Sequence, residues 1–209
     1  MTGLRRPLVF ALTTSAAGFA GAAWWWRRHP SACPYGQRFW VEAPHPLITR
    51  RRLLEALVPT AGERLLEIGP GTGYYSLPVA DRLAPGGALE LVDIQQKMLD
   101  HTLRQAAKAG IGNLVARQAD ARALPFEDDR FDGAFLVTVL GEIPDPARAL
   151  RELARVLRPG GRLVVGELVG DPHWVRPTRL RANAEAAGLR FDRRIGTPLG
   201  YFARFVATT

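Results

Sequence analysis

Short apolar runs alternate with stretches of helical periodicity along most of this chain. The apolar runs predict buried strands near 64–68, 88–92, 113–117, 132–138 and 162–167. Between most of them, apolar residues recur at helical spacing, which predicts helices near 74–83, 95–109 and 146–157. Because strand and helix alternate, we expect an α/β fold with a doubly wound, mostly parallel sheet that helices cover on both faces.

The pattern changes at both ends of this region. After it come a helix near 177–187 and two apolar segments, 189–194 and 201–207, which are joined by a loop of two glycines and a proline. A loop this short predicts an antiparallel hairpin. Before the region, apolar positions recur at helical spacing from Leu47 to Val58, opposite the triplet Arg50–Arg52, which predicts an amphipathic helix.

The N-terminal segment contains a long uncharged run, Leu8–Trp26, with arginines on both sides. As a helix this run would span roughly 28 Å, close to the hydrocarbon thickness of a bilayer. The flanking arginines and Trp24–Trp26 favour a transmembrane or interfacial anchor. The alternatives are a cleaved signal peptide, with small residues at Ala20–Ala22, and a soluble helix packed on its own domain. More arginines follow the run than precede it, so the positive-inside rule places the globular part at the cytoplasmic face of the membrane. The alternative is a cytoplasmic protein without a membrane anchor.

Three segments are therefore expected along the chain. Residues 1–29 form the apolar helix, residues 30–46 form a linker or lid because they contain four prolines and Gly36, and residues 47–209 form the globular domain. Within the linker, Tyr35 and His45 are candidates for a lid over a bound ligand, and solvated linker residues are the alternative.

The net charge of +8 belongs mostly to the N-terminal part. Eight of the 28 basic residues lie in residues 1–52, where Glu42 is the one acidic residue. A strongly basic chain suggests nucleic-acid binding, but the rest of this one is nearly neutral, so no nucleic-acid partner is predicted. One cysteine, Cys33, excludes an intramolecular disulfide and a cysteine-based zinc site. No metal site is predicted.

The stretch 65–76, L-L-E-I-G-P-G-T-G-Y-Y-S, is the most informative part of the sequence. An apolar strand leads directly into three alternating glycines, Gly69, Gly71 and Gly73, and then into a helix. Such a loop exposes backbone N–H groups at a helix N-terminus to a ligand. Tyr74 stands where the dinucleotide fingerprint requires Gly or Ala, and no G-K-[ST] is present, so the loop indicates a nucleotide-type cradle that is not a P-loop.

Acidic residues follow the next two predicted strands. Asp93 ends the second strand, where a carboxylate can accept both hydroxyls of a ribose. Asp120 ends the third, where an acid can accept from an adenine amino group. Two further motifs follow, F-D-G-A at 131–134 and L-R-P-G-G at 157–161. Both acids belong to the edge of the sheet at which open α/β folds bind ligands.

In this order, the motifs resemble those of the class I S-adenosylmethionine-dependent methyltransferases, in particular the group called methyltransferase type 11. The resemblance covers about residues 60–170 and leaves residues 1–50 outside. It implies a Rossmann-like, seven-stranded sheet with strand order 3-2-1-4-5-7-6, in which the C-terminal hairpin supplies the last two strands. It also implies S-adenosyl-L-methionine as the cofactor.

The resemblance assigns cofactor roles to matching positions of the glycine loop. The backbone at Gly69, Pro70, Gly71 and Gly73 would approach the methionine moiety. Glu67 would orient the ammonium group of that moiety, directly or through water.

It likewise assigns the adenosine moiety to the next two strand ends. Asp93 would hold the ribose and Ile94 would pack on the adenine ring. Asp120, with Ala121 beside it, would meet the adenine amine.

Methyl transfer from a sulfonium is an in-line displacement, so alignment and exclusion of water can supply most of the catalysis. A general base is needed only if the acceptor must lose a proton. Groups that could act as a base follow the fourth and fifth predicted strands: Glu142, Glu167, Asp171 and His173. Of these, His173 and Glu142 are the catalytic candidates. A neutral imidazole suits base work near pH 7. The alternatives are a surface histidine that caps the next helix and a plain loop carboxylate.

The leading hypothesis is a membrane-associated methyltransferase that acts on a small, hydrophobic acceptor such as a lipid, quinone or isoprenoid-derived compound. The alternatives are a methyltransferase for a soluble metabolite or thiol, and a regulator that binds the cofactor without turnover. RNA methylation is disfavoured because V-L-G-E at 139–142 replaces an N-P-P-Y-type tetrapeptide. The sequence does not predict an oligomeric state.

Overall fold

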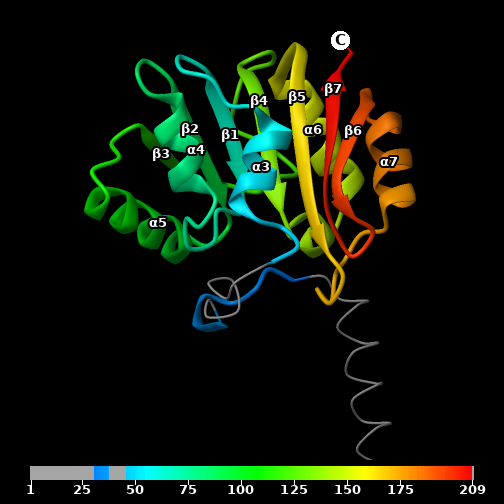
Figure 1. Ribbon diagram of the computed structural model, residues 1–209, viewed down its shortest axis with the longest axis horizontal. Helices are drawn as coiled ribbons and strands as arrows, with labels where there is room; N and C mark the ends of the chain where they lie inside the picture. The colour runs from blue at the N-terminus through cyan, green and yellow to red at the C-terminus, as the bar shows by residue number, and fades with distance from the viewer. Residues whose placement is uncertain (1–30, 38–45, 209) are drawn as a thin grey trace, which may run out of the picture.

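The computed structural model of this protein describes residues 31–37 and 46–208. Seven strands form one sheet in the order β3-β2-β1-β4-β5-β7-β6 (Figure 1). Neighbouring strands run parallel, except that β7 runs antiparallel to β5 and to β6. The strands are β1 (Arg64–Ile68), β2 (Ala88–Asp93), β3 (Leu114–Gln118), β4 (Phe131–Val137), β5 (Leu157–Leu168), β6 (Leu189–Thr197) and β7 (Gly200–Ala207). The predicted sheet and its C-terminal hairpin are confirmed.

The central strands are buried on both faces, which is why they are continuous apolar runs rather than alternating ones. In β1, Leu65, Leu66 and Ile68 are at most 4% exposed. The register pairs Ile68 with Val92 of β2 and with Leu136 of β4. The carboxyl ends of these three strands therefore meet at one edge of the sheet, and the loops that follow them lie together.

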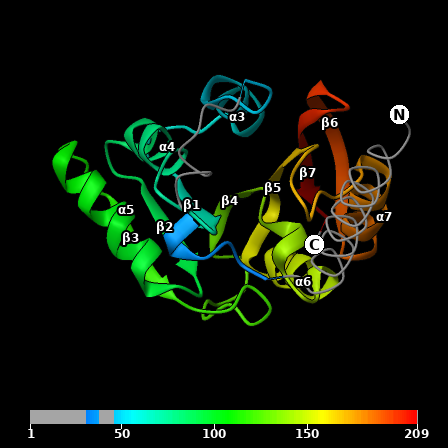
Figure 2. The same ribbon diagram turned by 90° about the horizontal axis from the view of Figure 1, so that it is seen from below.

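Helices cover both faces of the sheet (Figure 2). Apolar side chains of three helices join one core cluster, and those of two others join a second cluster on the opposite face. The first three helices are α3 (Arg50–Leu57), α4 (Ser76–Leu83) and α5 (Gln96–Lys108), and the other two are α6 (Pro146–Val156) and α7 (Pro177–Ala186). Two short 3-10 helices, η1 (Tyr35–Gln37) and η2 (Leu140–Glu142), lie in the connections.

Helix α3, the predicted amphipathic helix, is tied to the sheet by a buried cation. Its N-terminus is capped by the Thr49 hydroxyl, which accepts from the Arg52 N–H at 3.3 Å. Arg162 of β5 is 8% exposed, donates to the Leu57 carbonyl at the end of the helix and forms an ion pair with Glu63 at 2.6 Å. The ion pair neutralises a guanidinium that would be costly to bury alone.

Two element boundaries differ from the sequence-based expectation. Helix α4 begins at Ser76 rather than at position 74, because the glycine loop continues through Tyr74 and Tyr75 as turns. Strand β5 begins at Leu157, five positions before the expected start at 162. Leu157 pairs with Phe131 of β4, and the next pair, Arg162 with Gly133, follows an irregularity in register that accommodates the R-P-G-G segment.

The predicted apolar helix at Leu8–Trp26 lies outside the described residues, as does His45. Within residues 31–37 and 46–208, no helix combines the length and the apolar character needed to cross a membrane.

Candidate active site

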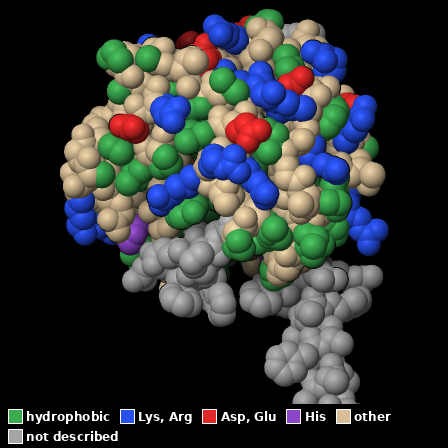
Figure 3. All heavy atoms as spheres, in the orientation of Figure 1, with side chains coloured by type: hydrophobic (Ala, Val, Ile, Leu, Met, Phe, Trp, Pro, Cys, Tyr) green, Lys and Arg blue, Asp and Glu red, His purple; other side chains and the backbone are tan. Residues whose placement is uncertain are grey.

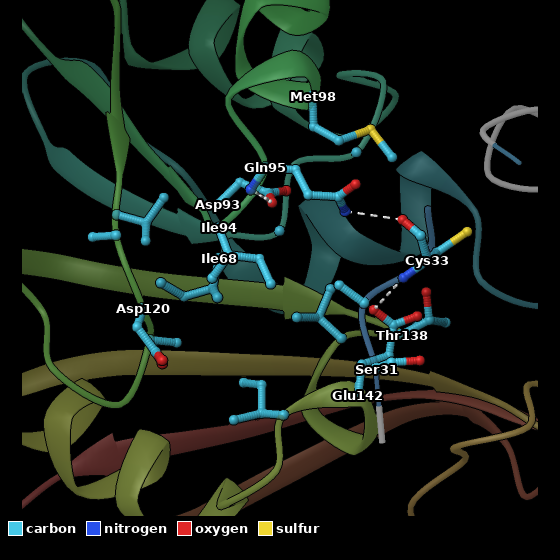
Figure 4. A pocket seen from close by; sticks show the side chains of 18 of the residues that line it. Ser31, Cys33, Ile68, Asp93, Ile94, Gln95, Met98, Asp120, Thr138 and Glu142 are labelled. Carbon is cyan, nitrogen blue, oxygen red and sulfur yellow. Dashed lines mark hydrogen bonds between the residues drawn. The ribbon is translucent and has the colours of Figure 1, made fainter. Parts of the chain in front are cut away.

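Two adjoining cavities lie at the carboxyl edge of the sheet. The first cavity has a volume of about 350 Å³ and the second about 560 Å³. Figure 4 shows residues that line the first cavity. Seven residues line both cavities: Ser31, Ala32, Cys33, Gly69, Val137, Thr138 and Glu142. The two cavities therefore meet between the glycine loop, the end of β4 and the segment that precedes η1.

The glycine loop separates the two cavities. Gly69 lines both, Gly71 lines the first and Pro70 lines the second. Gly69 has a φ of 66°, and a Cβ atom there would lie 2.6 Å from a methyl group of Val139. A side chain at Gly69 would thus clash with the loop after β4, so the glycine is required for the close approach of the two loops.

Gly73 has a different position from the one expected for a cofactor contact. It is not a lining residue of either cavity, and a Cβ atom there would lie 2.9 Å from Leu77 and 3.0 Å from Thr102. The Thr102 hydroxyl of α5 donates to the Gly71 carbonyl at 3.0 Å. Gly73 therefore lets the loop pack against α4 and α5, which fixes the backbone at Gly71.

Asp93 and Ile94 lie side by side in the first cavity, as Figure 4 shows. Asp93 ends β2, and its Oδ1 accepts from the Gln95 N–H at 2.8 Å. Burial raises the pKa of the Asp93 carboxyl to about 6, so it is ionised at neutral pH. Ile94 is 52% exposed although it is apolar, and it lines this cavity.

Asp120 and Ala121 line the same cavity after β3. The Asp120 carboxylate is already paired with the Arg122 guanidinium at 2.6 Å, which holds its pKa below the usual range. Sequence reasoning missed this partner, although a basic residue two positions after an acid is the available signal. Any amine that approaches Asp120 shares the carboxylate with Arg122.

Glu67, the penultimate residue of β1, lines the second cavity. It is 2% exposed, and its Oε2 has no hydrogen-bond partner among the described residues. Burial raises the pKa of the Glu67 carboxyl to about 8; the nearby Ser76 hydroxyl opposes this effect, and the Asp93 charge adds a smaller contribution to it. A buried carboxyl of this kind gains from a cation that enters the cavity.

Three of the four groups predicted after β4 and β5 come together at the second cavity. Glu142 of η2, Asp171 and His173 all line it. The Asp171 carboxylate accepts from the backbone N–H of His173 at 2.7 Å. Burial, together with the Asp171 charge, raises the pKa of Glu142 to about 8. The fourth group, Glu167, is 1% exposed and is not a lining residue.

A strap formed by residues 31–37 crosses the junction of the two cavities. The Gln95 side chain donates to the Cys33 carbonyl at 2.9 Å and accepts from the Tyr35 N–H at 3.2 Å. The Cys33 N–H donates to Glu142 at 3.3 Å, and the Tyr35 hydroxyl lies 3.3 Å from Nδ1 of His101. Figure 4 shows the contacts of Cys33 with Gln95 and Glu142. Tyr35, a predicted lid residue, belongs to the same segment as Ser31, Ala32 and Cys33, which line both cavities, but it is not a lining residue itself.

Comparison with known proteins gives the chain a family. The family model described as a methyltransferase domain matches residues 66–165. A phosphatidylethanolamine N-methyltransferase of Cereibacter sphaeroides is 34% identical over 148 residues, which are 70% of this chain and 68% of that protein. The chain belongs to the class I S-adenosylmethionine-dependent methyltransferases.

Other members of the family match over a shorter part of their length. A ubiquinone/menaquinone biosynthesis C-methyltransferase of Hahella chejuensis is 42% identical over 51% of this chain and 43% of its own. A demethylmenaquinone methyltransferase of Clavibacter sepedonicus is 38% identical over 56% of this chain and 46% of its own. The chain thus spans less than half the length of these two relatives.

A solved methyltransferase of Aquifex aeolicus has the same fold. Its TM-score with this chain is 0.75 at 20% sequence identity, over 84% of this chain and 98% of the other.

The cavities of this methyltransferase fit S-adenosylmethionine, the cofactor of its family. The first cavity offers an ionised acid, Asp93, for the ribose hydroxyls and an apolar surface of Ile94 and Met98 for the adenine ring. The second offers Glu67, a buried carboxyl with an unpartnered oxygen, for the ammonium group. Gly69 lines both cavities, so the glycine loop would lie between these two ends of a bound cofactor.

Within the described part of the chain, no three His, Cys, Asp or Glu residues are grouped so that they could hold a metal ion.

Proposed function

We propose that this protein transfers the methyl group of S-adenosylmethionine to a small acceptor with a hydrophobic body, of lipid, quinone or isoprenoid type. The observation that carries the proposal is the junction of the two cavities. The second cavity is the larger one, apolar side chains such as Ile48, Val137 and Leu168 line it, and it adjoins the first cavity at Gly69 and Glu142. An acceptor in the second cavity therefore lies beside the methionine end of the cofactor.

The relatives support a hydrophobic acceptor without specifying one. Two of them are named for ubiquinone, menaquinone or demethylmenaquinone, and a third is named for phosphatidylethanolamine. These acceptors differ in the atom that receives the methyl group, but each carries a long apolar body.

The chain's own residues would align the reactants. S-adenosylmethionine, when bound, supplies an electrophilic methyl group on a sulfonium. Asp93 and the glycine loop would fix the cofactor, and the strap of residues 31–37 would exclude water from the junction. Glu142 lies at that junction and His173 lines the second cavity, so either group is placed to take a proton from an acceptor.

We further propose that the protein works at the cytoplasmic face of a membrane, where the uncharged run Leu8–Trp26 anchors it as a single-pass or interfacial helix. The support lies in the sequence: arginines flank the run and tryptophans end it. A hydrophobic acceptor held in a bilayer favours an enzyme that is held beside it.

Transfer of a labelled methyl group tests the proposed activity. Purified full-length protein is incubated with tritiated S-adenosylmethionine and a total membrane extract, and the organic phase is counted after extraction. We expect label in the organic phase, and at least tenfold less with Asp93→Ala. Cofactor binding without any labelled product in organic or aqueous fractions would contradict the proposal and favour a regulator. Label confined to aqueous metabolites would contradict the hydrophobic acceptor.

A further inference from the structure

The second cavity is lined by acids without a basic counterpart. Glu67, Glu142 and Asp171 line it, and no Lys or Arg is among its described lining residues. Arg50 is stacked on the ring of Tyr74 at 3.9 Å, but it is not a lining residue itself. His173 contributes the one imidazole among the described lining residues, and its backbone N–H donates to the Asp171 carboxylate. Three carboxyls thus surround a space that is otherwise largely apolar.

A further carboxyl lies directly behind this cluster. Glu167 is 1% exposed, its Oε2 accepts from the Val175 N–H at 3.0 Å, and its Oε1 has no hydrogen-bond partner among the described residues. Burial raises the pKa of Glu167 to about 8, with smaller contributions from the charges of Asp171 and Glu142. Glu167 Oε1 is therefore buried without a donor among the described residues, although Glu167 does not itself line the cavity. Because Glu67 is the carboxyl offered to the ammonium group of the cofactor, Glu142 and Asp171 are the lining acids left for the acceptor.

Buried acids that face one another cost free energy unless a cation or a set of donors compensates them. A cationic acceptor supplies both a charge and N–H donors. A neutral quinone or alcohol supplies no charge, and a phenolate or enolate would be repelled.

We infer that the second cavity binds the methyl acceptor as a protonated amine on an apolar body, with Glu142 and Asp171 receiving the ammonium group. This inference rests on the proposed function and names the class of its acceptor. Glu142 lines both cavities, so an ammonium group beside it lies at the junction through which the methyl group must pass. Ile48 and Leu168 line the same cavity and offer apolar contact to the rest of the molecule.

The chemistry balances with the groups present. The ammonium first gives one proton to the Glu142 carboxylate, which leaves a neutral amine with a lone pair. The nitrogen then forms a bond to the methyl carbon while the carbon–sulfur bond breaks and its electron pair stays on sulfur. The products are a methylated ammonium, a neutral thioether and protonated Glu142, whose proton passes to water. Glu142 takes this proton in its carboxylate form, which an ammonium group beside it stabilises.

Binding of simple probes to the full-length protein tests this inference separately from turnover. Calorimetric titrations at pH 7.5, with S-adenosylhomocysteine bound, compare decylamine with 1-decanol, which has the same apolar body and no charge. Alkyl amines are protonated at this pH. We expect decylamine to bind at least tenfold more tightly than 1-decanol. Glu142→Gln and Asp171→Asn should each weaken decylamine binding at least fivefold and leave 1-decanol within twofold, while the exposed control Glu127→Gln changes neither.

The outcomes separate the inference from the proposed function. Equal affinity for the two probes, or decylamine affinity that neither variant changes, would overturn the amine acceptor. If S-adenosylhomocysteine itself does not bind, the proposed function fails with it. If the extract yields only methylated quinones or alcohols, the inference fails and the proposed function stands. Thermal unfolding checks that each variant is folded. If a variant does not fold, the comparison of decylamine with 1-decanol on the unsubstituted protein still tests the inference.

Discussion

Glu67 lies in an environment unlike that of an ordinary glutamate. Its pKa of about 8, against 4.5 for an unburied group, results first from burial. Between these two values the folded protein holds a proton that the unfolded chain has lost. The free energy of unfolding therefore falls as pH rises from about 4.5 to 8, by at most about 5 kcal/mol for this group at about 1.4 kcal/mol per pKa unit.

Glu67→Gln tests this residue directly. An amide cannot ionise, so the variant should lose less stability than the unsubstituted protein between pH 5 and 8, and it should have the higher melting temperature at pH 8. Chemical denaturation across this pH range measures the slope, without cofactor, and the exposed Glu127→Gln serves as the control. Identical slopes for all three proteins would contradict the raised pKa of Glu67.

Motifs that fix a strand end led to residues that line the cavities. Asp93 and Glu67 lie at or beside the predicted cavity because each belongs to a buried strand of known register. Asp120 lines the cavity as well. Its ion pair with Arg122 could not be predicted, because it depends on the direction that the Arg122 side chain takes after the end of β3. Gly73 matches the motif but lines neither cavity. It packs against Leu77 of α4 and Thr102 of α5, and the packing of these helices cannot be predicted from the motif.

Among the elements, the strap of residues 31–37 depends on one side chain for two of its contacts. Gln95→Ala removes the hydrogen bonds to Cys33 and Tyr35, each worth about 0.5 to 1.5 kcal/mol. Amide hydrogen exchange in a peptide that covers the strap should become roughly tenfold faster, while exchange in the β1 peptide stays unchanged.

Gln96→Ala is the matched control for the strap. Gln96 is the neighbouring residue, and its side chain bonds to Asp100 on the exposed side of α5. Exchange of the strap that is equally fast in the Gln95→Ala, Gln96→Ala and unsubstituted proteins would show that Gln95 does not hold it.

The strap also marks what the sequence could not predict at the level of elements. Helix α5 and strand β2 follow from periodicity, and they bring Gln95 to its place. The pairing of an amide side chain with a backbone segment about 60 positions earlier has no signature in local periodicity. Prolines indicated an irregular segment there, but not the site that it covers.

At the scale of the whole molecule, the alternation of apolar runs was sufficient to predict the layers of the sheet. Its strand order followed from the family resemblance, because periodicity alone does not say which strands are neighbours. The charge distribution adds a feature of the surface. Lys and Arg side chains spread over the face that carries α3, with fewer acidic side chains among them (Figure 3). Such a face suits an anionic membrane surface.

Removal of residues 1–28 tests the membrane proposal. The full-length chain should sediment with membranes and resist a salt wash, because an apolar segment, unlike surface charge, is not screened by salt. The shortened chain should appear in the supernatant with its S-adenosylmethionine affinity within threefold. A full-length chain that stays in the supernatant would contradict the anchor.

The central claim is that this chain binds S-adenosylmethionine at the carboxyl ends of β1 and β2, and a calorimetric titration tests it most directly. We predict one site per chain. Asp93→Ala should weaken binding by about 1 to 3 kcal/mol, which is roughly 5- to 150-fold in Kd, because the hydrogen bonds to the ribose are lost. The exposed control Asp81→Ala should bind as the unsubstituted protein does. Absence of binding, or binding that Asp93→Ala leaves unchanged, would contradict the account.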